Sequence, residues 1–415
     1  HPAYSCMKLP LCVEYNDTES TYNIDNIYSL EWWKREPEIK TWRIGRKYLV
    51  EVRANEFEYH PPHFHVSCNE FSAVFKMSDG NLYKDGKKKW TYQMVTEIKD
   101  WYETNKEEII KAITDVLESG VLILGEKGRE LERQYSKYIG TKYAVGCDNG
   151  TNAIVLALRA LGVGEGDEVI TVSNTAIPTV SAIVTTGAIP VFVDINPRTY
   201  LMDVTKLEAA ITPKTKCIVP VHIFGQCVDM DPLFEVAKKH NLFVLEDVAQ
   251  AQGAEYKGKK AGSMGNISTT SFYPTKILGT YGDGGMVNMN SKELHDKMKR
   301  LRFYGAERTY YAQEQGYNSR LDEIHASILL TKLPHIEEYI NRRREIAAIY
   351  DRELADTSLI LPFVEDYGKH AYYLYVIRHQ KRDEIITKLK ENNIFANISY
   401  PWPIHTMTGY QYLCY

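Results

Sequence analysis

Residues 271–285 read Ser-Phe-Tyr-Pro-Thr-Lys-Ile-Leu-Gly-Thr-Tyr-Gly-Asp-Gly-Gly, and this stretch carries most of the information in the chain. It places Lys276 between two apolar runs, at 267–273 and 285–289, that are typical of buried strands. The turn around the lysine contains too many glycines for a helix interior. Lysine is rarely buried without a partner, and a lysine removed from water is a nucleophile toward carbonyl carbons. The stretch therefore predicts a reactive lysine beside a buried sheet.

An acidic pair, Glu246-Asp247, ends an earlier apolar run at 242–245. Ligands of α/β sheets bind outside the carboxyl ends of strands, and Asp247 stands at such an end. A lysine that forms a Schiff base and an aspartate that pairs with a pyridinium nitrogen are what pyridoxal phosphate (PLP) chemistry needs. Gln250, one turn further on, is then within reach of the cofactor's ring hydroxyl. The alternative role for Asp247 is a helix N-cap for residues 248–251.

Residues 146–153, Gly-Cys-Asp-Asn-Gly-Thr-Asn-Ala, close one apolar run and open a helical pattern. A helix N-terminus presents free backbone N–H groups, which suit a phosphate, and a threonine adds a hydroxyl. Gly150 and Thr151 are therefore candidate phosphate ligands, and Ser271 offers a second hydroxyl. An ordinary helix cap is the alternative interpretation of this turn.

The texture of the 415-residue chain changes near residue 105, which predicts two or three domains. Short alternating runs such as 47–52 and 72–77 indicate antiparallel strands in the first part, followed by a helix at 90–112. Seven apolar runs then indicate an α/β sheet buried on both faces: 143–147, 168–172, 189–193, 217–223, 242–245, 268–273 and 286–288. A long helix at 329–354, a strand at 371–376 and a helix at 382–391 complete the chain. We expect domains at 1–105, 106–335 and 336–415.

Composition excludes several classes of function. The chain is 44% hydrophobic and 25% charged with a net charge of −4, and it has no block of like charges that would indicate a nucleic-acid partner. No apolar run reaches the roughly 20 residues that a membrane span needs. The seven cysteines are scattered and odd in number, which favours a reducing, cytoplasmic setting over a disulfide framework.

Three histidines gather in the first part of the chain, at His60, His63 and His65. His63 and His65 alternate and would share one face of a strand, which raises a metal hypothesis. No acidic or cysteine ligand accompanies them at a recognisable spacing, so a structural or surface turn is the preferred interpretation and we predict no metal site. With its Pro-Pro-His-x-His core the segment resembles the small DUF4160 family, and this resemblance implies a domain boundary without a function.

From about residue 106 to 415 the chain resembles the DegT/DnrJ/EryC1/StrS family of PLP-dependent sugar aminotransferases. The matching stretches occur in the family's order: Gly125-Glu126 with Glu130, 149–153, 166–170, 246–251, the Lys276 stretch and 316–323. The resemblance implies the α/β PLP-dependent transferase fold of type I, which is aspartate-aminotransferase-like. Its seven-stranded, mostly parallel sheet would be joined by a small α+β C-terminal domain and a small α+β N-terminal domain.

The resemblance also implies roles for single residues. Lys276 would bind PLP and later move the proton, Asp247 would pair with the pyridinium nitrogen, and Gln250 would lie near the ring oxygen. The phosphate would be held by Gly150, Thr151 and Ser271, and by Asn318 of a neighbouring subunit, so the active unit would be a homodimer with shared active sites. Two further residues, Arg320 and His405, would face the sugar. A solvated loop is the alternative for Asn318 and Arg320, and a surface position is the alternative for His405.

The chain departs from the family in two places. The family often has an aromatic residue that stacks on the pyridine ring, and Ala176 stands at that position. The family also continues for some tens of residues past the stretch 400–405, Tyr-Pro-Trp-Pro-Ile-His, so we expect an incomplete small domain. The sequence thus raises the question whether cofactor binding is weakened.

The predicted activity is transamination of a nucleotide-linked keto-deoxysugar, with an amino acid such as L-glutamate as the donor. Residues 304–318 resemble the branch that makes 3-amino sugars more than the 4-amino branch. Two alternatives belong to other classes. A PLP-dependent sugar dehydratase would have histidine in place of Lys276, and a non-catalytic sugar-binding or regulatory member would have no need of the set Lys276, Asp247 and Thr151.

Overall fold

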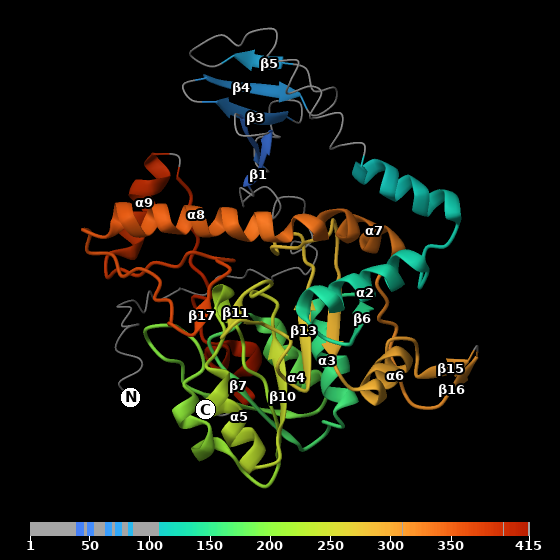
Figure 1. The fold of residues 1–415 in the computed structure, drawn as a ribbon. Coiled ribbons are helices and arrows are strands. Elements are labelled where there is room, and N and C mark those ends of the chain that lie inside the picture. Colours follow the sequence, from blue (N-terminus) through green and yellow to red (C-terminus); the bar gives the residue numbers. More distant parts are fainter. Residues whose placement is uncertain are drawn as a thin grey trace, which may run out of the picture. The chain divides into compact units, whose positions relative to one another are not determined.

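The computed structural model describes residues 39–44, 48–53, 63–68, 71–76, 82–85, 108–308, 310–392 and 394–413. They fall into two compact units, of which the first ends at Lys111 and the second begins at Ala112. Figure 1 colours the first unit blue and the second from teal to red.

The first unit contains a five-stranded antiparallel sheet in which each strand pairs with the next along the chain. Its strands are β1 (Ile39–Ile44), β2 (Tyr48–Arg53), β3 (His63–Cys68), β4 (Phe71–Lys76) and β5 (Leu82–Asp85). The predicted strands at 47–52 and 72–77 are confirmed as β2 and β4. His63 and His65 lie two residues apart on β3, on one face. His60 and most of the helix predicted at 90–112 lie outside the described residues.

A seven-stranded sheet forms the centre of the second unit, in the order β6-β14-β13-β10-β9-β7-β8. Its strands are β6 (Tyr143–Cys147), β7 (Glu168–Val172), β8 (Ile189–Val193), β9 (Thr215–Ile218), β10 (Phe243–Asp247), β13 (Ile267–Ser271) and β14 (Gly285–Met289). Strand β14 runs antiparallel to both of its neighbours and every other pair is parallel. The predicted mostly parallel sheet is therefore confirmed.

Helices cover both faces of this sheet (Figure 1). The α-helices are α2 (Glu126–Ile139), α3 (Gly150–Ala160), α4 (Ile177–Thr185), α5 (Met230–Lys239), α6 (Lys292–Leu301), α7 (Glu323–Lys332), α8 (Ile336–Leu354) and α9 (Arg382–Glu391). Small pairings are made by β11 (Glu255–Tyr256), β12 (Lys259–Lys260) and β17 (Gly368–Lys369), and by β15 (Ala306–Arg308) and β16 (Tyr311–Ala312). Within the described ranges no helix is long and apolar enough to cross a membrane.

Each face of the sheet has its own apolar core. Helix α3 packs on one face with α4 and α6, and most of its side chains are buried, as expected of a helix whose apolar residues surround it. Helices α2, α5 and α7 contribute to the core on the other face, with Leu131, Leu233 and Leu329. The sheet is thus enclosed, and its functional residues lie where its strands end.

The N-terminus of α2 is capped by a side chain from the distant helix α7. The buried carboxylate of Glu323 accepts hydrogen bonds from the backbone N–H groups of Lys127 and Gly128, each at 2.8 Å. A β-carbon on Gly125 or Gly128 would lie 2.5 or 2.8 Å from this carboxylate, so both positions require glycine. The two matching stretches that contain Gly125 and Glu323 therefore meet in space.

Three predicted elements are wrong in their extent. Residues 329–354 do not form one helix, because Pro334 cannot continue the α-helical hydrogen bonds and the 3-10 turn η6 (Leu333–His335) separates α7 from α8. Residues 371–376 form no strand, since Tyr372 has a φ of 49° and the backbone there pairs with a loop. Strand β9 ends at Ile218, before the predicted end at residue 223.

The acidic pair at the end of β10 divides into a structural and a site residue. Glu246 is fully buried and accepts hydrogen bonds from His222 Nε2 at 3.0 Å and from the N–H groups of Gly262, Met264 and Gly265. Burial alone would raise the pKa of Glu246, but the bonds from His222 and from these N–H groups outweigh it and hold the pKa below its ordinary value.

Replacing Glu246 with alanine is expected to lower the free energy of unfolding by about 3–5 kcal/mol, because its donors would remain buried without an acceptor. Urea unfolding measures this change. Glu235→Ala, on the exposed face of α5, is the control, with an expected change below about 0.5 kcal/mol. Since the folded pKa of Glu246 is lowered, its contribution is present above the unfolded pKa and is lost as the pH falls through the folded pKa. Equal unfolding of the variant and the wild type would contradict this role.

Candidate active site

Lys276 lies in the turn that follows β13, and its side chain is half-buried. Its backbone N–H donates to the carbonyl of Tyr273 at 2.9 Å. The amine points toward the ring of Tyr373, whose centroid is 4.6 Å from Nζ. The charge of Lys276 also lowers the pKa of Asp247, so the two predicted residues share one site.

Asp247 is the last residue of β10 and is 4% exposed. Its Oδ2 accepts a hydrogen bond from Thr179 Oγ1 at 2.8 Å, and its Oδ1 accepts from the N–H of Ala249 at 3.1 Å. Burial raises the pKa of Asp247 despite these bonds and the nearby amine of Lys276. A carboxylate in such a place is stabilised by a cation. The residues that follow form a turn, so Asp247 is not the N-cap of a helix at 248–251.

Thr179 belongs to a short chain of buried hydroxyl groups on α4. Its Oγ1 lies 3.0 Å from the Oγ1 of Thr175, and both side chains are at most 2% exposed. Because Thr179 donates its proton to Asp247, the carboxylate is held in one orientation. The sequence pattern alone did not identify Thr179.

Gln250 is buried beside Asp247, with both ends of its amide engaged. Its Oε1 accepts a hydrogen bond from the N–H of Phe224 at 2.9 Å, and its Nε2 donates to the hydroxyl of Tyr400 at 2.6 Å. The ring of Tyr400 stacks on that of Phe224 with centroids 6.1 Å apart. One proton of Nε2 is used by Tyr400, which leaves the other for a ligand's oxygen.

The predicted phosphate turn and Ser271 come together at the N-terminus of α3. Asn149 caps this helix by accepting from the N–H of Asn152 at 2.8 Å. A β-carbon on Gly150 would lie 2.7 Å from the β-carbon of Ser271, so only glycine lets the end of β13 approach so closely. Gly150, Thr151 and Ser271 thus line one corner, with backbone N–H groups of the helix terminus directed outward.

Ala176 lies at the start of α4, half-buried, in the turn that also carries Asn174. The Nδ2 of Asn174 is buried without a hydrogen-bond acceptor among the described residues. A buried donor of this kind indicates room for an acceptor from a ligand. The small Ala176 side chain and this donor lie in the turn between Ser173 and the threonines that hold Asp247.

His405 is tied to the same turn. Its Nδ1 lies 2.7 Å from Ser173 Oγ, which also accepts from the backbone N–H of His405 at 3.2 Å. Burial lowers the pKa of His405, so its ring is neutral near pH 7. The side chain is half-buried and packs 6.2 Å from the ring of Phe192. The structure therefore places His405 beside the site rather than on open surface.

Asn318 and Arg320 lie on the loop before α7. Asn318 is exposed and pairs through its backbone with Phe303. The guanidinium of Arg320 lies 5.6 Å from the ring centroids of both Phe303 and Tyr304. Ser319, between them, donates to Asp148 at 2.5 Å, next to the phosphate turn. The loop is close to the site of its own subunit, and its exposed asparagine is available to a second one.

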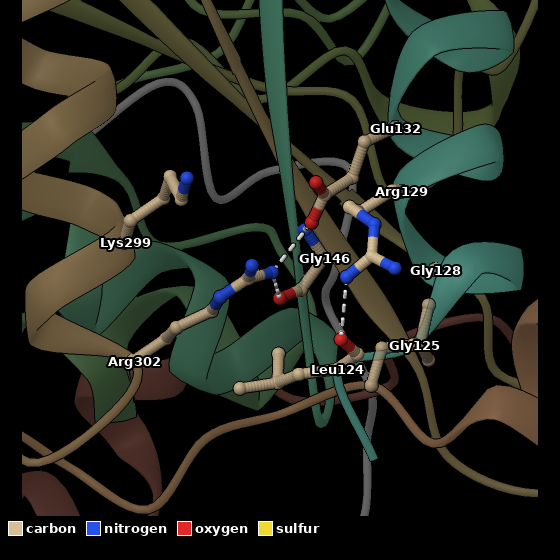
Figure 2. Close-up of a pocket in the computed structure, with 9 residues that line it drawn as sticks. Leu124, Gly125, Gly128, Arg129, Glu132, Gly146, Lys299 and Arg302 are labelled. Atoms are coloured by element: carbon tan, nitrogen blue, oxygen red, sulfur yellow. Dashed lines mark hydrogen bonds and ion pairs between the residues drawn. The ribbon is translucent and has the colours of Figure 1, made fainter. Parts of the chain in front are cut away.

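A cavity of about 190 Å³ lies elsewhere, between α2, β6 and α6 (Figure 2). Its lining includes Arg129, Lys299, Glu132 and Arg302, and none of the predicted site residues. Figure 2 shows Arg302 held between the carboxylate of Glu132 and the carbonyl of Gly146, the latter at 2.9 Å. The buried charges of this cavity compensate one another, so we do not assign the lysine chemistry to it.

The residues of the site fit PLP. A buried carboxylate without a cationic hydrogen-bond partner among the described residues suits a pyridinium nitrogen, and the helix terminus with Gly150 suits a phosphate. A half-buried lysine stands near the carboxylate. Together the fold and the site define the class of PLP-dependent transferases.

The chain belongs to the DegT/DnrJ/EryC1/StrS aminotransferase family, which matches residues 103–415. A domain of unknown function, DUF4160, matches residues 50–112. Over 318 residues the chain is 51% identical to a dTDP-3-amino-3,4,6-trideoxy-alpha-D-glucose transaminase of Micromonospora megalomicea subsp. nigra, with 75% of this chain and 85% of the relative covered. It is also 44% identical to a pleiotropic regulatory protein of Geobacillus stearothermophilus, with 77% and 87% covered.

Solved structures agree with this assignment. DesV of S. venezuelae, solved in complex with a ketimine intermediate, is 39% identical and superposes with a TM-score of 0.73 over 75% of this chain and 85% of its own. The sugar aminotransferase Spr1654 of Streptococcus pneumoniae in its PLP form is 31% identical, with a TM-score of 0.71 over 74% and 86%. The predicted family, fold type and cofactor are confirmed, and the chain is a PLP-dependent aminotransferase.

Replacing Thr179 with valine is expected to weaken PLP binding about tenfold or more, because a hydrogen bond to a buried charge is lost. Valine keeps the shape of the side chain, so the stability of the fold should change little. Titration of the apoprotein with PLP, followed by absorbance, measures the affinity. Thr179→Ser keeps the hydroxyl and is the matched control. Equal affinities for the valine variant and the wild type would exclude a role for Thr179.

Proposed function

We propose that the chain transfers an amino group from L-glutamate to a nucleotide-linked keto-deoxysugar in the cytoplasm. The observation that carries this proposal is the meeting of Lys276 with Asp247 at the edge of the sheet where the phosphate turn also lies. The free, buried cysteines Cys147, Cys217 and Cys227 agree with a reducing compartment.

Each residue has a distinct task in this scheme. Lys276 holds the cofactor covalently and, once released, carries the proton between the donor's α-carbon and the cofactor. Asp247, oriented by Thr179, keeps the ring nitrogen protonated, and Gln250 donates to the ring oxygen. Gly150, Thr151 and Ser271 hold the phosphate. Bound PLP would supply a ring that accepts electrons from the carbon that is being deprotonated.

The sugar would lie between the turn 173–176 and the stretch 400–405. His405 and Arg320 are candidate contacts for it, and the donor on Asn174 is a further one. The 3-amino branch is favoured by the resemblance in residues 304–318 and by the named activity of the Micromonospora relative. We therefore propose a 3-keto-deoxysugar as acceptor.

A two-stage absorbance experiment tests the proposal. The protein with PLP is expected to show the visible band of the lysine-linked cofactor, and L-glutamate should shift this band to the near ultraviolet with release of 2-oxoglutarate. Addition of nucleotide-linked 3-keto and 4-keto sugars, followed by mass spectrometry, identifies the acceptor. A visible band that no amino acid shifts would overturn the transaminase in favour of a binding or regulatory role.

The proposed homodimer with shared sites has its own test. Asn318 of one subunit would reach the phosphate held by its partner, so each site would need both chains. Mixing an inactive Lys276→Ala variant with an inactive Asn318→Ala variant should restore part of the activity, since one site of the mixed dimer contains both residues. No recovery, with mixed dimers shown by mass spectrometry, would place Asn318 in the site of its own chain.

A further inference from the structure

The amine of Lys276 lies over the face of an aromatic ring from a distant part of the chain. Nζ is 4.6 Å from the ring centroid of Tyr373, within the range of a cation–π contact. Tyr373 is half-buried and belongs to the segment 370–374, which reaches the site after α8. The tyrosine hydroxyl lies 3.2 Å from the Oγ1 of Thr275, the residue before the lysine. The ring is thus joined to the lysine turn at two points.

The backbone of Tyr373 is fixed from α8. The guanidinium of Arg343 donates to the carbonyls of Tyr372 and Tyr373, at 3.3 and 3.2 Å. Tyr372 has a φ of 49°, a conformation that bulky residues rarely adopt, so the segment is held by its surroundings rather than by its own preference. A ring placed with this effort beside a reactive amine indicates a function.

A second support comes from the loop that contains Phe224 and Gly225. The N–H of Ala371 donates to the carbonyl of Gly225 at 2.8 Å. A β-carbon on Gly225 would lie 2.8 Å from the nitrogen of Tyr372 and 2.9 Å from that of Tyr373, and its φ is +111°. Only glycine therefore lets the segment sit this close. The same loop donates the N–H of Phe224 to Gln250, so the ring and Gln250 are positioned by one piece of backbone.

We propose that Tyr373 is a positioning residue for Lys276, whose ring face holds the lysine amine within the site whenever the amine is not bound to the cofactor. The negative face of the ring attracts the ammonium ion, and the wall that it forms keeps the flexible side chain from turning toward water. A proton carrier must return to the same carbon for the second half of the reaction, and small misplacements are costly in rate. The inference rests on the proposed role of Lys276.

The test follows the apoprotein as it binds PLP. The rate at which the visible band appears after rapid mixing measures how well the free amine is placed, without any substrate turnover. Tyr373→Leu removes the ring and is expected to slow the band about tenfold, the scale of a lost cation–π contact in a desolvated place. Tyr373→Phe keeps the ring and should stay within about threefold of the wild type. In steady state the leucine variant should lose kcat with an unchanged KM for the donor.

Controls separate positioning from packing. Tyr375→Leu, two residues along, removes a ring whose hydroxyl bonds to Asp351 outside the site, and it should leave the rate unchanged. Tyr373→Met replaces the leucine variant if that one unfolds. An unchanged rate without the ring would overturn the inference, and so would an equal loss in Tyr373→Phe, which would assign the effect to the hydroxyl. A band that survives in Lys276→Ala would instead overturn the proposed function.

Discussion

Replacing Lys276 with alanine is expected to abolish transamination, with a loss of at least about 10³-fold in kcat, because the residue provides both the covalent link and the acid–base group. PLP should still bind through its phosphate and its ring nitrogen, so the variant should show the spectrum of free PLP in a bound state. Release of 2-oxoglutarate from L-glutamate measures the loss. Gel filtration with absorbance detection measures the retained cofactor.

Two variants control for this result. Lys276→Arg keeps a positive charge but cannot form the link, so it should be as inactive as the alanine variant. Lys238→Ala, on the exposed side of α5, should keep full activity. Full activity in Lys276→Ala would show that the reactive lysine lies elsewhere and would sink the proposed mechanism.

Replacing Asp247 with asparagine is expected to weaken PLP binding about 100-fold or more, since breaking a buried charge pair costs about 3–5 kcal/mol. Asparagine is nearly isosteric and still accepts from Thr179, so the pocket should keep its shape. The amide does not stabilise a protonated ring nitrogen, and the rate with L-glutamate should fall together with the affinity. Titration with PLP and single-turnover kinetics measure the two effects.

The stability of the protein provides a second view of Asp247. Burial raises its pKa in the absence of a cation, so ionising it opposes folding of the apoprotein. PLP should therefore raise the melting temperature of the wild type more than that of Asp247→Asn. Asp231→Asn, whose carboxylate pairs with Lys257 at the exposed start of α5, serves as control. Equal stabilisation of all three proteins by PLP would show that Asp247 does not meet the ring nitrogen.

The sheet could be predicted because its strands are buried on both faces and read as continuous apolar runs. The predicted runs at 143–147, 168–172 and 189–193 match β6, β7 and β8 residue for residue. Local signals also placed Lys276, Asp247 and the phosphate turn, since each follows a strand or begins a helix. Such features depend on neighbours in the chain, and a single sequence contains them.

The rest of the site depends on contacts between distant segments, which leave no local pattern. Thr179 meets Asp247 from 68 residues away, and Tyr400 meets Gln250 from 150. Tyr373 lies in a stretch whose alternation indicates a strand, yet its hydrogen bonds go to the Gly225 loop and to Arg343. The pair Glu246-Asp247 predicted a functional site, and only the structure separates the residue that holds the loops from the one that faces the cofactor.

The cap on α2 has a consequence for synthesis of the chain. Glu323 is 196 residues from Lys127, so α2 leaves the ribosome long before its cap exists. Until then the N–H groups at its start face water, and the helix can be only transiently formed. The sheet must bring α7 back before this long loop closes, which makes late docking a slow step that exposes apolar surface to aggregation. The unit that ends at Lys111 has by then been synthesised in full, so it can fold while the aminotransferase unit waits for its last third.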